Sequence, residues 1–147
     1  MVKKFNLRVY GLIVNKKSEV LLSDEYRFGT FFTKFPGGGI EFGEGIIEAL
    51  KRELIEELDF TFDQAIPIYF NDFHQESAFQ KEEQLVAFYY LISCKKGTKL
   101  GTNHSIPFYA EGEKQRWVSL NSIKEEDLSF PIDKIAMKSL KKYLLIS

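Results

Sequence analysis

Three glutamates close together in the sequence are the residues of this chain best suited to chemistry. Glu53, Glu56 and Glu57 stand at i, i+3 and i+4 of an apolar repeat, so on a helix they share one face. Like charges at such spacings destabilise a helix by roughly 0.2–0.5 kcal/mol per close pair. A divalent cation would neutralise them, and Mg²⁺ prefers oxygen ligands, with substrate phosphates completing its shell. The pattern predicts a metal site for a phosphorylated substrate.

A glycine-rich loop and a helix must position these carboxylates. The loop begins with Gly37-Gly38-Gly39, and the helix is predicted over residues 45–58. Its buried stripe recurs at helical spacing and comprises Ile46, Ile47, Leu50, Leu54 and Leu58.

The loop and helix together resemble the signature of the Nudix (MutT-like) hydrolases. Gly38, Glu44 and the run Arg52-Glu53-Leu54-Ile55-Glu56-Glu57 match its positions. Residues 35–38 and 116–120 also look like family features. Asp59 stands where the signature has glycine, and we expect a left-handed helix end there, because Asp tolerates that conformation better than most residues.

The resemblance implies an enzyme that uses Mg²⁺ or Mn²⁺ to hydrolyse the diphosphate of a nucleoside diphosphate linked to another moiety. The substrate would be of the nucleoside triphosphate or sugar-nucleotide type. The resemblance assigns metal binding to Gly37, Glu53, Glu56 and Glu57, and catalysis to Glu53, Arg52 and Glu56. Glu53 is a metal ligand or the base that activates water. Arg52 is expected to hold a glutamate by a forked pair.

Further candidates lie outside these positions. Gly38 would let backbone approach the substrate, and three basic residues before the helix could meet phosphate: Arg8, Arg27 and Lys34. A further acidic residue often assists in this family. The sequence does not choose among Glu82, Glu83, Glu111 and Glu113. Aromatic residues that could stack a base are Phe70, Phe73, Phe79, Tyr89 and Tyr90.

Each feature taken alone has a simpler explanation. Three glutamates would be a solvated helix face, Arg52 a surface partner of Glu48 or Glu56, and Glu44 a favourable charge at a helix N-terminus. His74 and His104 are expected on the surface, and Asp133 as a helix-start residue. The joint spacing of the signature outweighs these explanations. The alternative from another class is a catalytically silent Nudix-like domain that binds a nucleotide metabolite as a sensor.

Composition places further bounds on the protein. The 147 residues suit a single domain, 1–147, and a net charge of −1 predicts neither nucleic-acid nor membrane affinity. Cys94 is the only cysteine, which excludes an intrachain disulfide and favours a reducing, cytoplasmic setting. No signal peptide or membrane span is predicted. The expected partner is a small nucleotide; homodimers occur in the family, and the sequence argues neither way.

The remaining pattern predicts strands around one long helix, followed by a second helix. Strands are expected over residues 5–15, 19–23, 31–33, 68–73, 85–93 and 115–120, with the first two forming a hairpin. Loops are expected at 75–83 and 95–112, a short helix through residue 127 and a C-terminal helix over 133–145. These elements indicate an α/β (α+β) fold. The resemblance implies an α/β/α sandwich with a mixed sheet between helices.

Overall fold

The structure is a computed structural model that describes residues 1–95 and 98–146. These residues form seven strands, two α-helices and one 3₁₀ turn, Glu125–Asp127. The helices are α1 (Ile46–Leu58) and α2 (Pro131–Tyr143). The strands are β1 (Lys4–Val14), β2 (Glu19–Arg27), β3 (Thr30–Lys34), β4 (Gly37–Gly39), β5 (Ile66–Phe70), β6 (Glu83–Ser93) and β7 (Gly112–Ser119).

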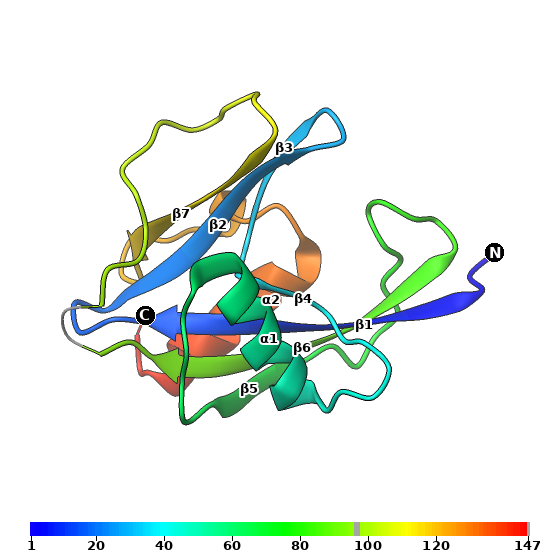
Figure 1. Ribbon diagram of the computed structural model, residues 1–147, viewed down its shortest axis with the longest axis horizontal. Helices are drawn as coiled ribbons and strands as arrows, with labels where there is room; N and C mark the ends of the chain where they lie inside the picture. Colours follow the sequence, from blue (N-terminus) through cyan, green and yellow to red (C-terminus); the bar gives the residue numbers. More distant parts are fainter. Residues whose placement is uncertain (96–97, 147) are drawn as a thin grey trace.

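All strands belong to one mixed sheet (Figure 1). Its main path runs β3-β2-β1-β6-β5, while β4 pairs with β1 and β7 pairs with β2. Strands β1 and β6 are parallel along their whole length, from Lys4 opposite Glu83 to Val14 opposite Ser93. The other pairings are antiparallel, including the predicted β1–β2 hairpin.

Alternating side chains of the central strands build a core on each face of the sheet. On one face, Leu12 and Tyr89 pack with Leu140 of α2. On the other face, Ile13 and Ile92 pack with Leu54 of α1. Since successive strand residues point to opposite faces, one sheet supplies both cores. The helices therefore cover opposite faces, and the predicted α/β/α sandwich is confirmed (Figure 1).

Helix α1 begins and ends as the sequence chemistry requires. The Glu48 carboxylate accepts a hydrogen bond of 2.8 Å from the Gly45 N–H at the helix start. At the other end Asp59 has φ 51° and ψ 40°, the predicted left-handed conformation, and its N–H donates to the Ile55 carbonyl. Asp59 thus closes the helix without glycine.

Several predicted elements differ in the structure. Residues 37–39 form a short strand, because their backbone pairs with β1. The strand predicted over residues 68–73 begins earlier, at Ile66, and so includes Pro67, which is tolerated because β5 is an edge strand. The helix expected before residue 127 shrinks to the 3₁₀ turn. Residues 96 and 97 of the predicted loop lie outside the described residues. None of the described helices is long and apolar enough to cross a membrane.

Candidate active site

A cavity of about 630 Å³ opens where β1 and β2 separate. These strands pair at Val14, the last residue of β1, and Val20, near the start of β2; β2 then pairs with β3 and β7, while the preceding part of β1 pairs with β4 and β6. The space between them is lined by side chains from β1, β2, β3, β6, β7, both helices and the segment 75–80. Residues far apart in the sequence therefore meet in one place.

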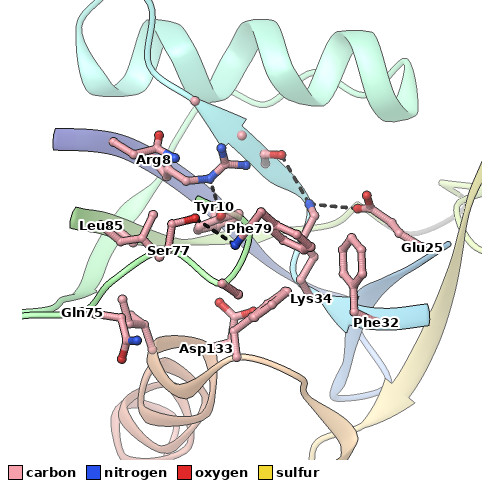
Figure 2. A pocket seen from close by; sticks show the side chains of 18 of the residues that line it. Arg8, Tyr10, Glu25, Phe32, Lys34, Gln75, Ser77, Phe79, Leu85 and Asp133 are labelled. Atoms are coloured by element: carbon pink, nitrogen blue, oxygen red, sulfur yellow. Dashed lines mark hydrogen bonds and ion pairs between the residues drawn. The ribbon is translucent and has the colours of Figure 1, made fainter. Parts of the chain in front are cut away.

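Glu53 and Glu57 form the acidic wall of this cavity. They are one helical turn apart on α1, which spans the cavity above β4 (Figure 2). Glu57 Oε2 is buried and has no hydrogen-bond partner. Burial raises the pKa of Glu57 to about 8; Lys34 opposes this effect, and the Glu113 and Glu53 charges add to it. Without a cation this raised pKa keeps the Glu57 carboxyl largely protonated near neutral pH, with one oxygen unsatisfied, and a bound cation would favour its ionised form.

Two glycines let the backbone approach these carboxylates. A Cβ placed on Gly38 would lie 2.5 Å from the Glu53 carboxyl carbon. Gly37 has φ +147°, and a Cβ there would collide with the Val9 carbonyl and stand 2.7 Å from Tyr10 Cα. Gly37 is thus required by the backbone of β1, and Gly38 by the position of Glu53.

Glu56 does not line the cavity, which differs from the prediction that all three glutamates converge. Its side chain is 58% exposed, against 15% for Glu53, and it lies 3.3 Å from Arg52 Nη1. Glu56 and Glu57 are consecutive residues, and consecutive residues point in different directions around a helix. Glu57 therefore faces the sheet, whereas Glu56 faces water. Within the described residues, no three acidic, histidine or cysteine side chains are gathered closely enough to hold a metal as they stand.

Arg52 makes the expected forked pair, and its partner is Glu44. Arg52 Nε and Nη2 donate to the two Glu44 carboxylate oxygens at 2.6 and 2.9 Å. The same guanidinium donates to the Gly39 carbonyl at 2.9 Å and to Glu53 at 3.1 Å. Arg52 therefore ties the loop after β4 to the helix and fixes one oxygen of Glu53.

Arg8 and Lys34 supply positive charge on either side of Tyr10. Arg8 Nε donates to the Tyr10 hydroxyl at 2.6 Å, and the Lys34 ammonium lies 5.5 Å from the Tyr10 ring centre. Burial lowers the pKa of both bases, but nearby negative charges outweigh it and hold each pKa above its usual value. Tyr10, which accepts the Arg8 hydrogen bond, contributes most to the raised pKa of Arg8, followed by Glu53 and Glu57, whereas Glu57 and Glu25 contribute most to that of Lys34. Both side chains stay charged in the cavity.

Glu25 is a cavity residue that the sequence reasoning missed. It is buried on β2 and accepts from Lys34 at 3.1 Å, from Arg27 at 2.9 Å and from the Ser23 hydroxyl at 3.2 Å. Arg27, a predicted phosphate contact, lines the cavity but is occupied by Glu25 and Glu113. The available signal was the charged pair Asp24-Glu25 continuing a strand that was predicted to end at Ser23.

The four remaining acidic candidates differ in whether they line the cavity. Glu113 on β7 lines the cavity beside Glu57, and burial raises its pKa, with the Glu25 charge adding. Glu83 also lines the cavity, near the segment 75–80. Glu111 is exposed, and Glu82 pairs with Lys3 at 3.5 Å outside the cavity. Glu113 is therefore the acidic residue placed to act with Glu57.

The opposite end of the cavity is aromatic with one buried acid (Figure 2). Phe79 lies 5.3 Å from Phe32 and 5.8 Å from Phe130, measured between ring centres. Asp133, predicted as a helix-start residue, is in the first turn of α2 and accepts a hydrogen bond from Tyr89. Burial raises the pKa of Asp133 to about 6. One end of the cavity thus carries acidic and basic side chains, and the other end is lined by aromatic rings that suit a flat ring.

His104, expected on the surface, is buried behind the cavity wall. Its Nε2 lies 2.8 Å from Asp24 Oδ2, and Arg116 Nε donates to the same oxygen at 2.7 Å. The Thr33 hydroxyl donates to the other Asp24 oxygen at 2.6 Å. This network joins the loop after β6 to β2, β3 and β7, and so supports the strand that carries Glu25.

Comparisons with known proteins agree with this architecture. The NUDIX domain family model matches residues 4–138. An 8-oxo-dGTP diphosphatase of Escherichia coli (strain K12) is 27% identical over 143 residues, covering 96% of this chain and 99% of that protein. An RNA pyrophosphohydrolase of Actinobacillus pleuropneumoniae serotype 5b (strain L20) is 31% identical over 118 residues, or 80% of this chain. The match spans only 48% of that relative's length.

Solved structures show the same fold at low sequence identity. A MutT protein from Methanosarcina mazei Go1 has a TM-score of 0.70 at 20% identity, with 98% of each chain covered. A MutT structure from a study of Aliivibrio salmonicida and Vibrio cholerae has a TM-score of 0.66 at 24% identity, covering 94% of this chain and 98% of that one.

Proposed function

Because the chain belongs to the NUDIX family, we propose that it is a Mg²⁺-dependent pyrophosphohydrolase. Its substrate is a nucleoside diphosphate linked to another moiety, with a nucleoside triphosphate as the first candidate. The observation that carries this proposal is the buried, unpartnered Glu57 oxygen beside Glu53 and Glu113, in a cavity that also holds Arg8 and Lys34. Acidic side chains alone would repel a diphosphate, and a site that bound phosphate through basic side chains alone would need no carboxylates. The presence of both fits a site that holds a cation together with phosphates.

Glu53 and Glu57 are the proposed cation ligands, with Glu113 beside them and the Gly37 carbonyl as a backbone ligand. Glu56 can join this set only by leaving Arg52, with which it is paired. Mg²⁺ or Mn²⁺ at this position would neutralise diphosphate charge and make a bound water more acidic. The fit rests on hard oxygen donors and on the unsatisfied Glu57 oxygen.

The chain's own residues would orient the reaction. Arg8 presents its guanidinium to the substrate phosphates, held in place by the Tyr10 hydroxyl. As the alternative to binding the cation, Glu53, fixed on one oxygen by Arg52, would accept a proton from the attacking water with its other oxygen. Phe79, Phe32 and Phe130 offer ring faces to a base, and Asp133 offers an acceptor at its edge. A nucleotide would thus lie with its phosphates under α1 and its base toward α2.

Our choice between substrates rests on the share of each relative's length that this chain matches. The match to the 8-oxo-dGTP diphosphatase covers 99% of that protein, whereas the matches to RNA pyrophosphohydrolases cover between 32% and 79% of theirs. We therefore propose that a free nucleotide, and not the 5′ end of an RNA, is the preferred substrate. We also propose one domain for the chain, a cytoplasmic location and action as either a monomer or a homodimer.

A substrate panel tests the proposal. Purified protein is assayed for pyrophosphate-bond hydrolysis against nucleoside triphosphates including 8-oxo-dGTP, sugar nucleotides and a 5′-triphosphate RNA. Each is tested with Mg²⁺, with Mn²⁺ and with EDTA. Hydrolysis that survives EDTA would overturn the metal mechanism, and binding of a nucleotide without turnover would favour the sensor alternative.

Two acid variants sharpen this test. Glu57→Gln should abolish most turnover while the protein stays folded, because the amide removes a ligand without changing the shape. Glu113→Gln should reduce turnover, whereas Glu111→Gln should leave it unchanged, since Glu111 is exposed and outside the cavity. Near-full activity of Glu57→Gln would show that the ligand assignment is wrong.

A further inference from the structure

The Lys34 ammonium stands among oxygens that a cation would also use. Its Nζ lies 3.1 Å from Glu25 Oε2, 3.2 Å from the Phe35 carbonyl and 3.5 Å from the Gly37 carbonyl. The same ammonium acts through space on Glu57, whose second oxygen has no partner. Lys34 therefore already occupies the neighbourhood proposed for the metal.

Glu25 holds Lys34 in this position. The Lys34 and Glu25 side chains are 10% and 5% exposed, and they point toward each other across the cavity wall (Figure 2). Glu25 is in turn fixed by the Ser23 hydroxyl and by Arg27. A long lysine side chain is normally free to move, but here its head is bound by one carboxylate and two carbonyls.

We propose that Lys34, positioned by Glu25, is a tethered counter-charge that competes with the divalent cation for Gly37 and Glu57. This inference rests on the proposed function, because it concerns the same cation site. A fixed positive charge a few ångströms away weakens the binding of a second cation. An arriving diphosphate compensates the ammonium charge. Cation binding and diphosphate binding then strengthen each other, as two linked ligands must.

The proposal predicts opposite effects for the two members of the pair. Lys34→Met removes the competing charge and should tighten Mn²⁺ binding to the substrate-free protein by about tenfold. Glu25→Gln releases the ammonium toward Gly37 and Glu57, and should loosen Mn²⁺ binding. Glu25→Gln should have a smaller effect when residue 34 is already changed, since Glu25 acts through Lys34. In the Lys34→Met single variant Glu25 still contacts Ser23 and Arg27, so its carboxylate keeps partners.

Electron paramagnetic resonance of free Mn²⁺ during titration measures these affinities directly. Lys34→Arg keeps the charge and should bind close to wild type. Lys51→Met is the matched control, because Lys51 is an exposed lysine of α1 near Phe62, outside the cavity. Thermal unfolding of each variant verifies folding, and Lys34→Gln replaces Lys34→Met if the latter does not fold.

The outcomes separate this inference from the proposed function. Mn²⁺ binding to wild type that Glu57→Gln abolishes, together with tighter binding by Lys34→Met, supports both. The same Glu57 result with unchanged or weaker binding by Lys34→Met overturns the counter-charge alone. Absence of Mn²⁺ binding in both the wild type and Lys34→Met overturns both the metal site and the competition.

Discussion

Gly38 lies directly against the carboxylate of Glu53: a Cβ on residue 38 would stand 2.5 Å from Glu53 Cδ and Oε1. The glycine belongs to β4 and the glutamate to α1, so the contact sets how closely the helix side chain approaches the loop backbone. Adjacent Gly37 faces backbone atoms of β1 instead. The two glycines therefore serve different purposes, which neighbouring substitutions can separate.

Gly38→Ala should impair activity more than folding. The added methyl group displaces the Glu53 carboxylate, and because this is the end of a flexible side chain, the fold can accommodate it. Misplacement of a reacting group by about 1 Å can cost about 100-fold in rate. Steady-state kinetics and urea unfolding of the same preparation measure both effects.

Gly37→Ala should show the reverse balance. Its φ of +147° and the collision with the Val9 carbonyl predict a loss of at least about 2 kcal/mol in the free energy of unfolding. Gly43→Ala is the control, because Gly43 has φ +87° but nothing within 4 Å of its Cβ position. It should cost only about 1–2 kcal/mol. A Gly37→Ala protein as stable as wild type would contradict the assignment.

Arg52→Lys should lower kcat while retaining the charge. Lysine cannot donate simultaneously to both Glu44 oxygens, Gly39 and Glu53, so Glu53 and the loop after β4 lose their common anchor. We expect a decrease in kcat of about 10- to 100-fold, measured at saturating cation. The exposed neighbour Lys51, changed to Arg, is the control. An unchanged kcat would show that charge alone matters at residue 52.

Asp24→Asn should destabilise the fold rather than change the chemistry directly. Asp24 is fully buried and accepts from Arg116, Thr33 and His104. Removing one member of a buried charged network typically costs about 3–5 kcal/mol. Urea unfolding measures the loss, with exposed Asp63→Asn as the control. A loss below about 1 kcal/mol would mean that the network does not hold the loop after β6.

Asp133→Asn should alter the pH dependence of stability. The pKa of Asp133 is raised from 3.8 to about 6, mainly by burial, so the folded protein binds this proton more tightly than the unfolded chain does. The contribution of this proton to the free energy of unfolding is therefore fully present below pH 3.8 and is lost as the pH rises toward 6. The loss is on the order of 3 kcal/mol. Wild type and Asp133→Asn, unfolded with urea between pH 3.5 and about 8, should differ in slope only in this window.

Much of the fold could be predicted because local patterns were decisive. Leu50 and Leu54 marked the buried face of α1, and Asp59 marked its left-handed end. The strand and helix pattern indicated an α/β (α+β) fold, and the resemblance to the Nudix signature implied the sandwich. Residues 37–39 could not be identified as a strand from their glycines, because pairing with β1 depends on tertiary structure.

The candidate site was predictable in its acids but not in its surroundings. Glu53 and Glu57 lie in the cavity, whereas Glu56, one position away, faces water. Helical spacing places residues on a broad face and does not decide which of them the sheet covers. Glu25 was missed, and Asp133 was interpreted only as a helix-start residue, for a related reason: their importance comes from burial beside Lys34 and Tyr89, which are distant in sequence.

The parallel pairing of β1 with β6 has a consequence for how the protein is made. During synthesis on the ribosome, β1 emerges early but must wait for residues 83–93 before its long edge is covered. Until then its main-chain groups are open to pairing with other chains. Such a long-range closure is also slow compared with a local hairpin. The nascent chain is therefore most vulnerable to aggregation before β6 emerges.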